Sequence, residues 1–245
     1  MIPRLIHQSW KDDAIPERWL PLQASWKRLH PDYRYHYWTD RANRDFIAAH
    51  DRQFLELYDS YPLDIERAEL ARYLILYHLG GLYVDMDFEA LRPVDDLLSG
   101  TALAFGLEPD SHAQRTGVRE RGLARIVCNA FMASAPGHRF WPHFLSLLGD
   151  VTDKSNVLDA TGTFALTRAC DSYAAATDIV FVPAAKLYPL DNDEIRTLGG
   201  EQRQAKLSGA YAIHHWAGSW WRESLLKRAH GRITKARRDV TPAND

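Results

Sequence analysis

One stretch, ELARYLILYHLGGLYVDMD at residues 69–87, carries most of the information about the fold. Upstream of it, Asp64 is a suitable N-cap, and the pair Gly80-Gly81 is a suitable helix stop. We therefore expect residues 65–79 to form a helix of about four turns. The apolar run at 82–84 that follows predicts a short strand. A helix followed directly by a strand is typical of an α/β domain.

The predicted helix places an arginine among apolar side chains. At about 3.6 residues per turn, one stripe of this helix contains Ile65, Glu69, Arg72, Leu76 and Leu79. The opposite face is apolar too, so we expect the helix to be buried on most sides. An unpaired buried charge is very costly, and Arg72 must therefore have polar or charged partners.

Two carboxylates, Asp85 and Asp87, follow the predicted strand. In extended backbone, residues at i and i+2 point to the same side, and the carboxyl end of a strand is where open α/β sheets bind ligands. Two close anions repel each other, so a cation is expected between them. Mg²⁺ or Mn²⁺ suits oxygen ligands and can bridge to phosphates. A solvated Asp-x-Asp without a metal is the alternative reading of this motif alone.

Apolar runs and helix-length segments alternate along the rest of the chain, as in an α/β domain. Strands are expected at 2–6, 33–38, 82–84, 102–105, 126–132, 179–182 and 211–216, and helices at 16–29, 41–58, 65–79, 140–148 and 164–173. Residues 110–123 are polar and are expected to form a mobile loop. We expect one domain over residues 1–226, followed by a basic tail at 227–245.

Composition excludes several classes of protein. The 245 residues are 46% hydrophobic and 25% charged, with a net charge of −2, which gives no electrostatic reason to expect nucleic acid as a partner. Cys128 and Cys170 are too few for a disulfide framework. Neither a signal peptide nor a membrane span is visible, so we expect a cytoplasmic protein. The basic tail either is solvated or makes a peripheral contact with the inner face of the membrane.

Residues 69–87 resemble the signature of the sugar-nucleotide glycosyltransferases of family 32, and the catalytic domains of the large clostridial glucosylating toxins look similar over the same run. The family pattern is an acidic residue, two spacers and arginine, followed by Gly-Gly-x-Tyr-x-Asp-x-Asp. Other segments resemble family blocks in the same order, at 2–10, 37–40, 129–133, 160–162 and 214–220. Two positions depart from the pattern, because Glu69 stands where Asp is frequent and Thr163 where Pro is frequent.

The resemblance implies a GT-A fold, which is a single Rossmann-like sandwich with a mostly parallel central sheet. It also implies a nucleotide-sugar donor, a divalent metal (Mn²⁺ or Mg²⁺) and retention of the anomeric configuration. The implied metal ligands are Asp85, Asp87 and His214, although His215 alternates with His214 and only one of them can face the site. The implied catalytic core is Asp85, Asp87 and Arg72, which act electrostatically, since no nucleophile can be named. The residues expected to bind the nucleotide sugar are His7, Trp10, Glu69, Arg72, Tyr83, Asp85, Asn129, Gly162, Ser219 and Trp220.

The expected function is therefore transfer of a hexose from a UDP-sugar or GDP-mannose to a glycan or another hydroxyl acceptor. A phosphatase of the haloacid dehalogenase type also uses Asp-x-Asp after a strand. That motif requires Thr or Val two residues beyond the second Asp, where this chain has Glu89. A non-catalytic glycan-binding module would use the eight tryptophans for stacking on sugars, but it would have no use for an acidic pair that awaits a metal.

Overall fold

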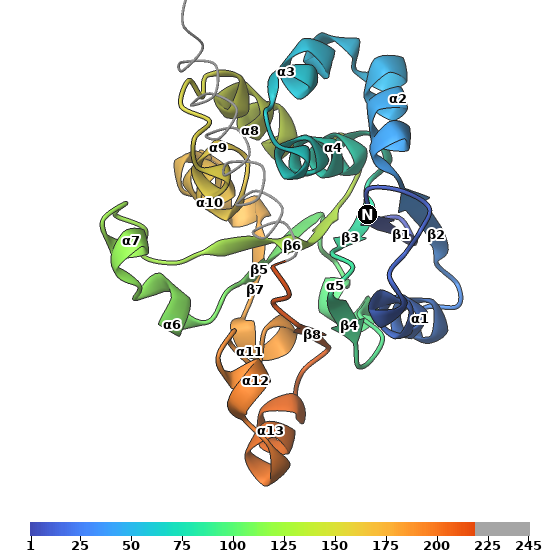
Figure 1. The fold of residues 1–245 in the computed structure, drawn as a ribbon, viewed down its shortest axis with the longest axis vertical. Helices are drawn as coiled ribbons and strands as arrows, with labels where there is room; N and C mark the ends of the chain where they lie inside the picture. Colours follow the sequence, from blue (N-terminus) through green and yellow to red (C-terminus); the bar gives the residue numbers. More distant parts are fainter. Residues whose placement is uncertain (219–245) are drawn as a thin grey trace, which may run out of the picture.

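A six-stranded sheet dominates the computed structural model, which describes residues 1–218 (Figure 1). Its strand order is β2-β1-β3-β6-β5-β7. The pairs β1–β2, β1–β3 and β5–β7 are parallel, whereas β6 runs antiparallel to both of its neighbours. The bounds are β1 Leu5–Ser9, β2 Arg34–Trp38, β3 Gly81–Val84, β5 Leu103–Leu107, β6 Val127–Ser134 and β7 Val180–Val182. The central sheet is thus mostly parallel, as predicted.

A second, two-stranded sheet lies beside the end of β3. It pairs β4 (Phe88–Ala90) with β8 (Ala212–His214) in antiparallel register, with Phe88 opposite His214. This ladder brings residues near the end of the described chain next to the turn that carries the two aspartates. The sequence patterns predicted the strand at β8 but not its partner β4.

Helices cover both faces of the large sheet (Figure 1). On one face, apolar side chains of α4, α8 and α10 share a core with β3, β5 and β6; on the other, Trp26 of α1 and Leu187 of α11 pack with Phe88. The first face carries α2 (Asp40–His50), α3 (Leu55–Ser60), α4 (Asp64–Leu79), α8 (Phe140–Gly149), α9 (Val157–Ala160) and α10 (Thr163–Ser172). The other carries α1 (Leu20–Leu29), α5 (Asp95–Leu98), α11 (Ala184–Leu187), α12 (Glu194–Thr197) and α13 (Gly200–Leu207).

Helix α4 is buried along most of its length, as its two apolar faces predicted. Its beginning differs from the expectation, because Leu63 rather than Asp64 is the N-cap residue. The side chain of Glu66 accepts a hydrogen bond from the Leu63 backbone nitrogen at 3.0 Å and so closes the first turn. The helix ends at Gly80, as predicted.

Two other expectations need correction. The polar segment 110–123, expected as a mobile loop, forms two short helices, α6 (Asp110–Ala113) and α7 (Thr116–Arg119), and Arg121 pairs with Asp159 at 2.7 Å. The single helix expected at 41–58 is divided at Asp51, whose φ of −151° ends α2. Within residues 1–218, the search for a helix both long and apolar enough to cross a membrane found none.

The turn that joins α4 to β3 requires glycine. Gly80 has φ +64°, and a Cβ atom built there would lie 2.7 Å from the Pro136 ring and from the Ser134 carbonyl oxygen. Gly81 has φ +96°, and its Cβ would lie 2.8 Å from the Leu5 carbonyl oxygen. The left-handed backbone and the close approach of neighbouring strands therefore both exclude larger residues.

We expect Gly80→Ala to lower the free energy of unfolding by about 2–4 kcal/mol, because it adds a steric clash to an unfavourable φ. Gly100→Ala is the matched control, since Gly100 has φ +71° with no atom within 4 Å of the new Cβ. The control should lose only about 1 kcal/mol. Urea unfolding of both variants checks this, and equal losses would show that the close approach at Gly80 contributes nothing.

Candidate active site

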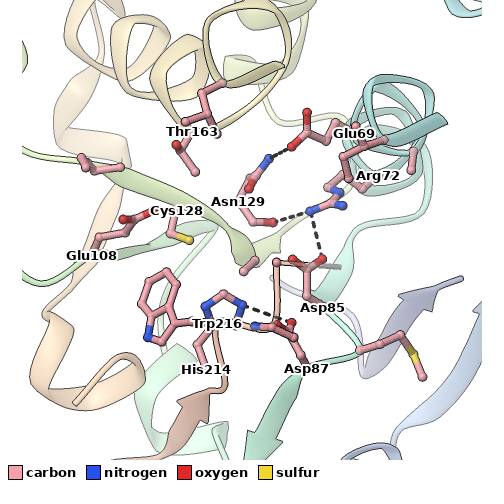
Figure 2. Close-up of a pocket in the computed structure, with 18 of the residues that line it drawn as sticks. Glu69, Arg72, Asp85, Asp87, Glu108, Cys128, Asn129, Thr163, His214 and Trp216 are labelled. Atoms are coloured by element: carbon pink, nitrogen blue, oxygen red, sulfur yellow. Dashed lines mark hydrogen bonds and ion pairs between the residues drawn. The ribbon is translucent and has the colours of Figure 1, made fainter. Parts of the chain in front are cut away.

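A cleft of about 770 Å³ opens where β1 and β3 end. Its walls come from separated parts of the chain: Glu69 and Arg72 on α4, Asn129 on β6, and His214 on β8. Asp85 and Asp87, which follow β3, lie between these walls (Figure 2). The position agrees with the rule that open α/β sheets bind ligands at the carboxyl ends of their strands.

The two aspartates lie on a tight turn rather than on extended backbone. The Phe88 backbone nitrogen donates to the Asp85 carbonyl oxygen at 3.1 Å, which closes a turn between β3 and β4. Both side chains line the cleft, as expected. The sequence analysis expected extended backbone to point the two carboxylates to the same side. In the structure, the turn brings them together instead.

Asp85, Asp87 and His214 together form a candidate metal site. Their ligand atoms all lie within 4.8 Å of one another. His214 Nε2 lies 3.1 Å from Asp87 Oδ1, whereas His215 turns to Glu89, with Nε2 2.9 Å from Oε2. Two carboxylates and one imidazole form a donor set that fits Mn²⁺ or Mg²⁺. Of the two adjacent histidines, His214 is therefore the one that meets the aspartates.

Burial and the neighbouring charges shift the pKa values of Asp85, Asp87 and His214. Burial raises the pKa of Asp85 above its usual value, although the Arg72 guanidinium opposes the shift. Burial acts in the same direction on Asp87, but the imidazole of His214 and the Ala217 backbone N–H outweigh it and bring the pKa of Asp87 down to about 2. Burial lowers the pKa of His214, and Asp87 more than reverses this, so the net shift is upward.

Arg72 connects the turn that carries the two aspartates to β6. Its side chain is 4% exposed, and Nη1 lies 3.0 Å from Asp85 Oδ1. The same nitrogen donates to the Asn129 carbonyl oxygen at 3.1 Å, and the guanidinium carbon lies 4.5 Å from the centre of the Tyr83 ring. The partners that a buried arginine requires are thus present, while Nε has no hydrogen-bond partner among the described residues.

Glu69 forms a network behind the arginine. Asn129 Nδ2 donates to Glu69 Oε1 at 2.9 Å, and the Thr161 hydroxyl donates to Oε2 at 2.5 Å. Tyr73 extends this network, because its hydroxyl donates to the Thr161 carbonyl oxygen at 2.7 Å. Burial raises the pKa of Glu69 to about 7, although the charge of Arg72 opposes it. The network fixes the Asn129 side chain at the wall of the cleft.

Trp10 and Tyr83, both expected at the nucleotide, line the cleft. The Trp10 ring meets Trp19 edge to face, with centroids 6.4 Å apart, and neither indole nitrogen has a hydrogen-bond partner among the described residues. The Tyr83 hydroxyl instead lies 2.6 Å from Ser9 Oγ. The expected sites Ser219 and Trp220 lie outside the described residues.

His7 and Gly162, both expected at the nucleotide sugar, do not line the cleft. The His7 side chain is completely buried, donates from Nε2 to the Gly80 carbonyl oxygen at 2.9 Å, and accepts from Trp38 at 3.2 Å. It therefore joins β1 to the glycine turn. Gly162 is packed behind the wall, where an added Cβ would lie 2.8 Å from Leu158 Cα.

Sequence reasoning missed part of the cleft wall. Glu108, His112 and Trp216 all line the cleft. Figure 2 shows Glu108 and Trp216 on the side opposite Arg72. A signal for Glu108 was available, since it directly follows the apolar strand β5 in the same way as Asp85 follows β3. His112 stands four residues further on, within the segment that was expected to be a loop.

Comparisons with known proteins agree with this geometry. A family described as glycosyltransferase sugar-binding region containing DXD motif matches residues 16–104. The predicted resemblance to that family is therefore confirmed. In solved structures, the PaToxG glycosyltransferase aligns with a TM-score of 0.53 at 16% identity, covering 72% of each chain. The predicted GT-A fold is confirmed.

Two curated relatives show the range of similarity. Inositol phosphoceramide mannosyltransferase 3 of Schizosaccharomyces pombe is 42% identical over 139 residues, which is 57% of this chain and 35% of that protein. The uncharacterized glycosyltransferase L373 of Acanthamoeba polyphaga mimivirus is 27% identical over 203 residues, or 79% of this chain and 76% of that one. The chain spans between 28% and 40% of the three inositol phosphoceramide mannosyltransferases that it matches.

We expect the isolated chain to bind Mn²⁺ without any donor, and we expect His214→Gln to weaken that binding at least about tenfold, because loss even of outer-shell support costs about that much. His215→Gln is the matched control and should bind as the unchanged chain does. Titration followed by electron paramagnetic resonance measures free Mn²⁺ directly. Equal loss in both variants would contradict the assignment of His214.

Proposed function

Since the chain is a relative of the DXD-motif glycosyltransferases, we propose that it is a metal-dependent retaining glycosyltransferase that moves a hexose from a nucleotide sugar to a hydroxyl acceptor. The observation that carries the proposal is the group Asp85, Asp87 and His214, which lies in a cleft beside a buried arginine. A glycan-binding module gives no account of why these four residues meet there, and the phosphatase motif would require Thr or Val where this chain has Glu89.

The three metal ligands would hold Mn²⁺ or Mg²⁺, which supplies positive charge to a leaving nucleoside diphosphate. Arg72 holds Asp85 in place through the 3.0 Å ion pair, and Ala217 N–H holds Asp87 Oδ2 at 2.9 Å. Because both carboxylates are fixed before the donor binds, little reorganisation is needed as charge develops. Trp10 and Trp19 both line the cleft, and we assign the nucleobase to them, since aromatic rings stack on bases.

Retention is proposed to occur by attack on the same face from which the diphosphate leaves. A bond forms between the acceptor oxygen and the anomeric carbon, while the bond from that carbon to the phosphate oxygen breaks. The hydroxyl proton goes to the departing phosphate oxygen. Glu69, Asp85 and Asp87 already hold protein partners, which supports a route in which none of these three acts as a nucleophile.

Several hexose donors fit a cleft of this kind. UDP-glucose, UDP-galactose, UDP-N-acetylhexosamine and GDP-mannose all join a sugar to a nucleoside diphosphate. Mannose is the first hexose to test, because several relatives are named as mannosyltransferases, including the initiation-specific alpha-1,6-mannosyltransferase of Candida albicans. We propose a glycan or another hydroxyl compound as the acceptor.

A donor screen with Mn²⁺ or Mg²⁺, scored by release of nucleoside diphosphate, tests the proposal. We expect release from at least one donor, and we expect Asp87→Asn to reduce it by more than about 100-fold, because one metal ligand is lost. Circular dichroism should show that the variant keeps its fold. Full release in excess chelator would rule out the metal, and turnover of nitrophenyl phosphate without donor cleavage would favour the phosphatase.

A further inference from the structure

The wall opposite Arg72 holds a carboxylate that the proposed mechanism does not use. Glu108 follows β5, and its side chain is 10% exposed and lines the cleft. Figure 2 shows it across the cleft from Arg72, on the same side as Trp216. Burying a charge is costly without compensation, so a carboxylate this buried is a candidate for a role in binding.

Glu108 is held on one oxygen and open on the other. Its Oε2 lies 2.7 Å from His112 Nδ1, and His112 Nε2 lies 3.0 Å from Asn192 Oδ1. The described residues offer Oε1 no hydrogen-bond partner, and Oε1 is not among the polar atoms sealed from solvent. One oxygen is therefore fixed by the protein, and the other is available to a bound molecule.

Trp216 links this carboxylate to the metal site. Its ring centroid lies 4.8 Å from that of His112 and 4.2 Å from that of His214. Its indole nitrogen donates to the Leu190 carbonyl oxygen at 2.9 Å, and its backbone has φ +49°, a conformation that is unfavourable for a tryptophan. Such strain persists where the surrounding structure holds it, and it is frequent at binding sites. The indole is thus fixed between His112, which holds Glu108, and His214, a proposed metal ligand.

The charge of Glu108 indicates what this wall accepts. A carboxylate repels phosphate, so the diphosphate belongs at the metal ligands and the group that meets Glu108 itself is uncharged. Arg115, which donates to Asn192 Oδ1, also lines the cleft. The other wall, where Arg72 donates to the Asn129 carbonyl oxygen, offers polar groups that suit the sugar of the donor. A carboxylate oxygen facing the cleft accepts hydrogen bonds from hydroxyl groups, and bonds to a charged acceptor are the stronger kind.

Building on the proposed glycosyl transfer, we propose that Glu108 binds the hydroxyl of the acceptor, that this acceptor is a neutral sugar or polyol, and that His112 and Asn192 position the carboxylate. The free oxygen Oε1 accepts a hydrogen bond from the acceptor and so aims the attacking oxygen. Glu108 forms no bond to the sugar, and the proton passes to the departing phosphate oxygen.

The test compares transfer with hydrolysis. The full chain is incubated with Mn²⁺ and the donor that the screen identifies, together with methyl α-mannoside, methyl β-glucoside, methyl β-galactoside or myo-inositol. Glycoside product and free sugar are quantified separately. We expect Glu108→Gln to lower the ratio of transfer to hydrolysis by about 10- to 100-fold, as loss of a charged hydrogen bond predicts. Glu108→Asp keeps the charge and should restore part of that ratio.

Glu89→Gln is the matched control. Glu89 also pairs with a histidine, His215 at 2.9 Å, but Glu89 does not line the cleft, so its variant should keep the unchanged ratio of transfer to hydrolysis. Asn192→Ala should lower the ratio by a smaller factor than Glu108→Gln, because it removes only the far support of His112. A raised acceptor KM with little change in donor KM would mark the acceptor as the molecule affected.

Several outcomes would overturn the inference. An unchanged ratio in Glu108→Gln would remove Glu108 from acceptor binding, and a raised donor KM with an unchanged ratio would assign it to the donor. A glycosyl adduct on Glu108, detected by mass spectrometry, would make it a nucleophile instead. A chain that hydrolyses donor but transfers to none of the four probes would contradict a neutral acceptor. Absence of any donor cleavage would overturn the proposed function itself.

Discussion

The buried ion pair between Arg72 and Asp85 is the constraint on which the site depends. With a side chain 4% exposed, Arg72 has little access to water, and removal of its partner would leave an uncompensated charge at a cost of several kcal/mol. The same guanidinium also holds the Asn129 carbonyl oxygen. Arg72 therefore ties helix α4 to the turn after β3 and to strand β6. If these elements moved apart, the buried charge would lose its partners, so the ion pair keeps the shape of the cleft.

The second aspartate is held from the opposite direction. Asp87 receives His214 and the Ala217 N–H from the segment that contains β8, more than 120 residues further along the chain. Burial raises the pKa of Asp85 although Arg72 of α4 opposes the shift, whereas His214 and the Ala217 N–H outweigh burial at Asp87 and lower its pKa. The candidate metal site is complete only when the β4–β8 ladder has formed, so the proposed metal binding would be coupled to folding.

Local spacing predicted the features that depend on neighbouring residues. The glycine stop, the buried arginine and the paired aspartates are all contained in residues 69–87. The sequence could not reveal why His7 is buried, because its partner Gly80 becomes a neighbour only when β1 pairs with β3. The place of Glu108 directly after β5 was a local signal, but its support was not visible, since Asn192 is 80 residues away from His112. Long-range pairing, rather than local propensity, determined these outcomes.

The position of Trp216 bears on the stereochemistry. In the proposed front-face mechanism, the acceptor hydroxyl and the leaving diphosphate must lie on the same side of the sugar. Trp216 contacts both His112, which holds the proposed acceptor-binding residue, and His214, a proposed metal ligand. One strained residue therefore fixes the distance between the two groups.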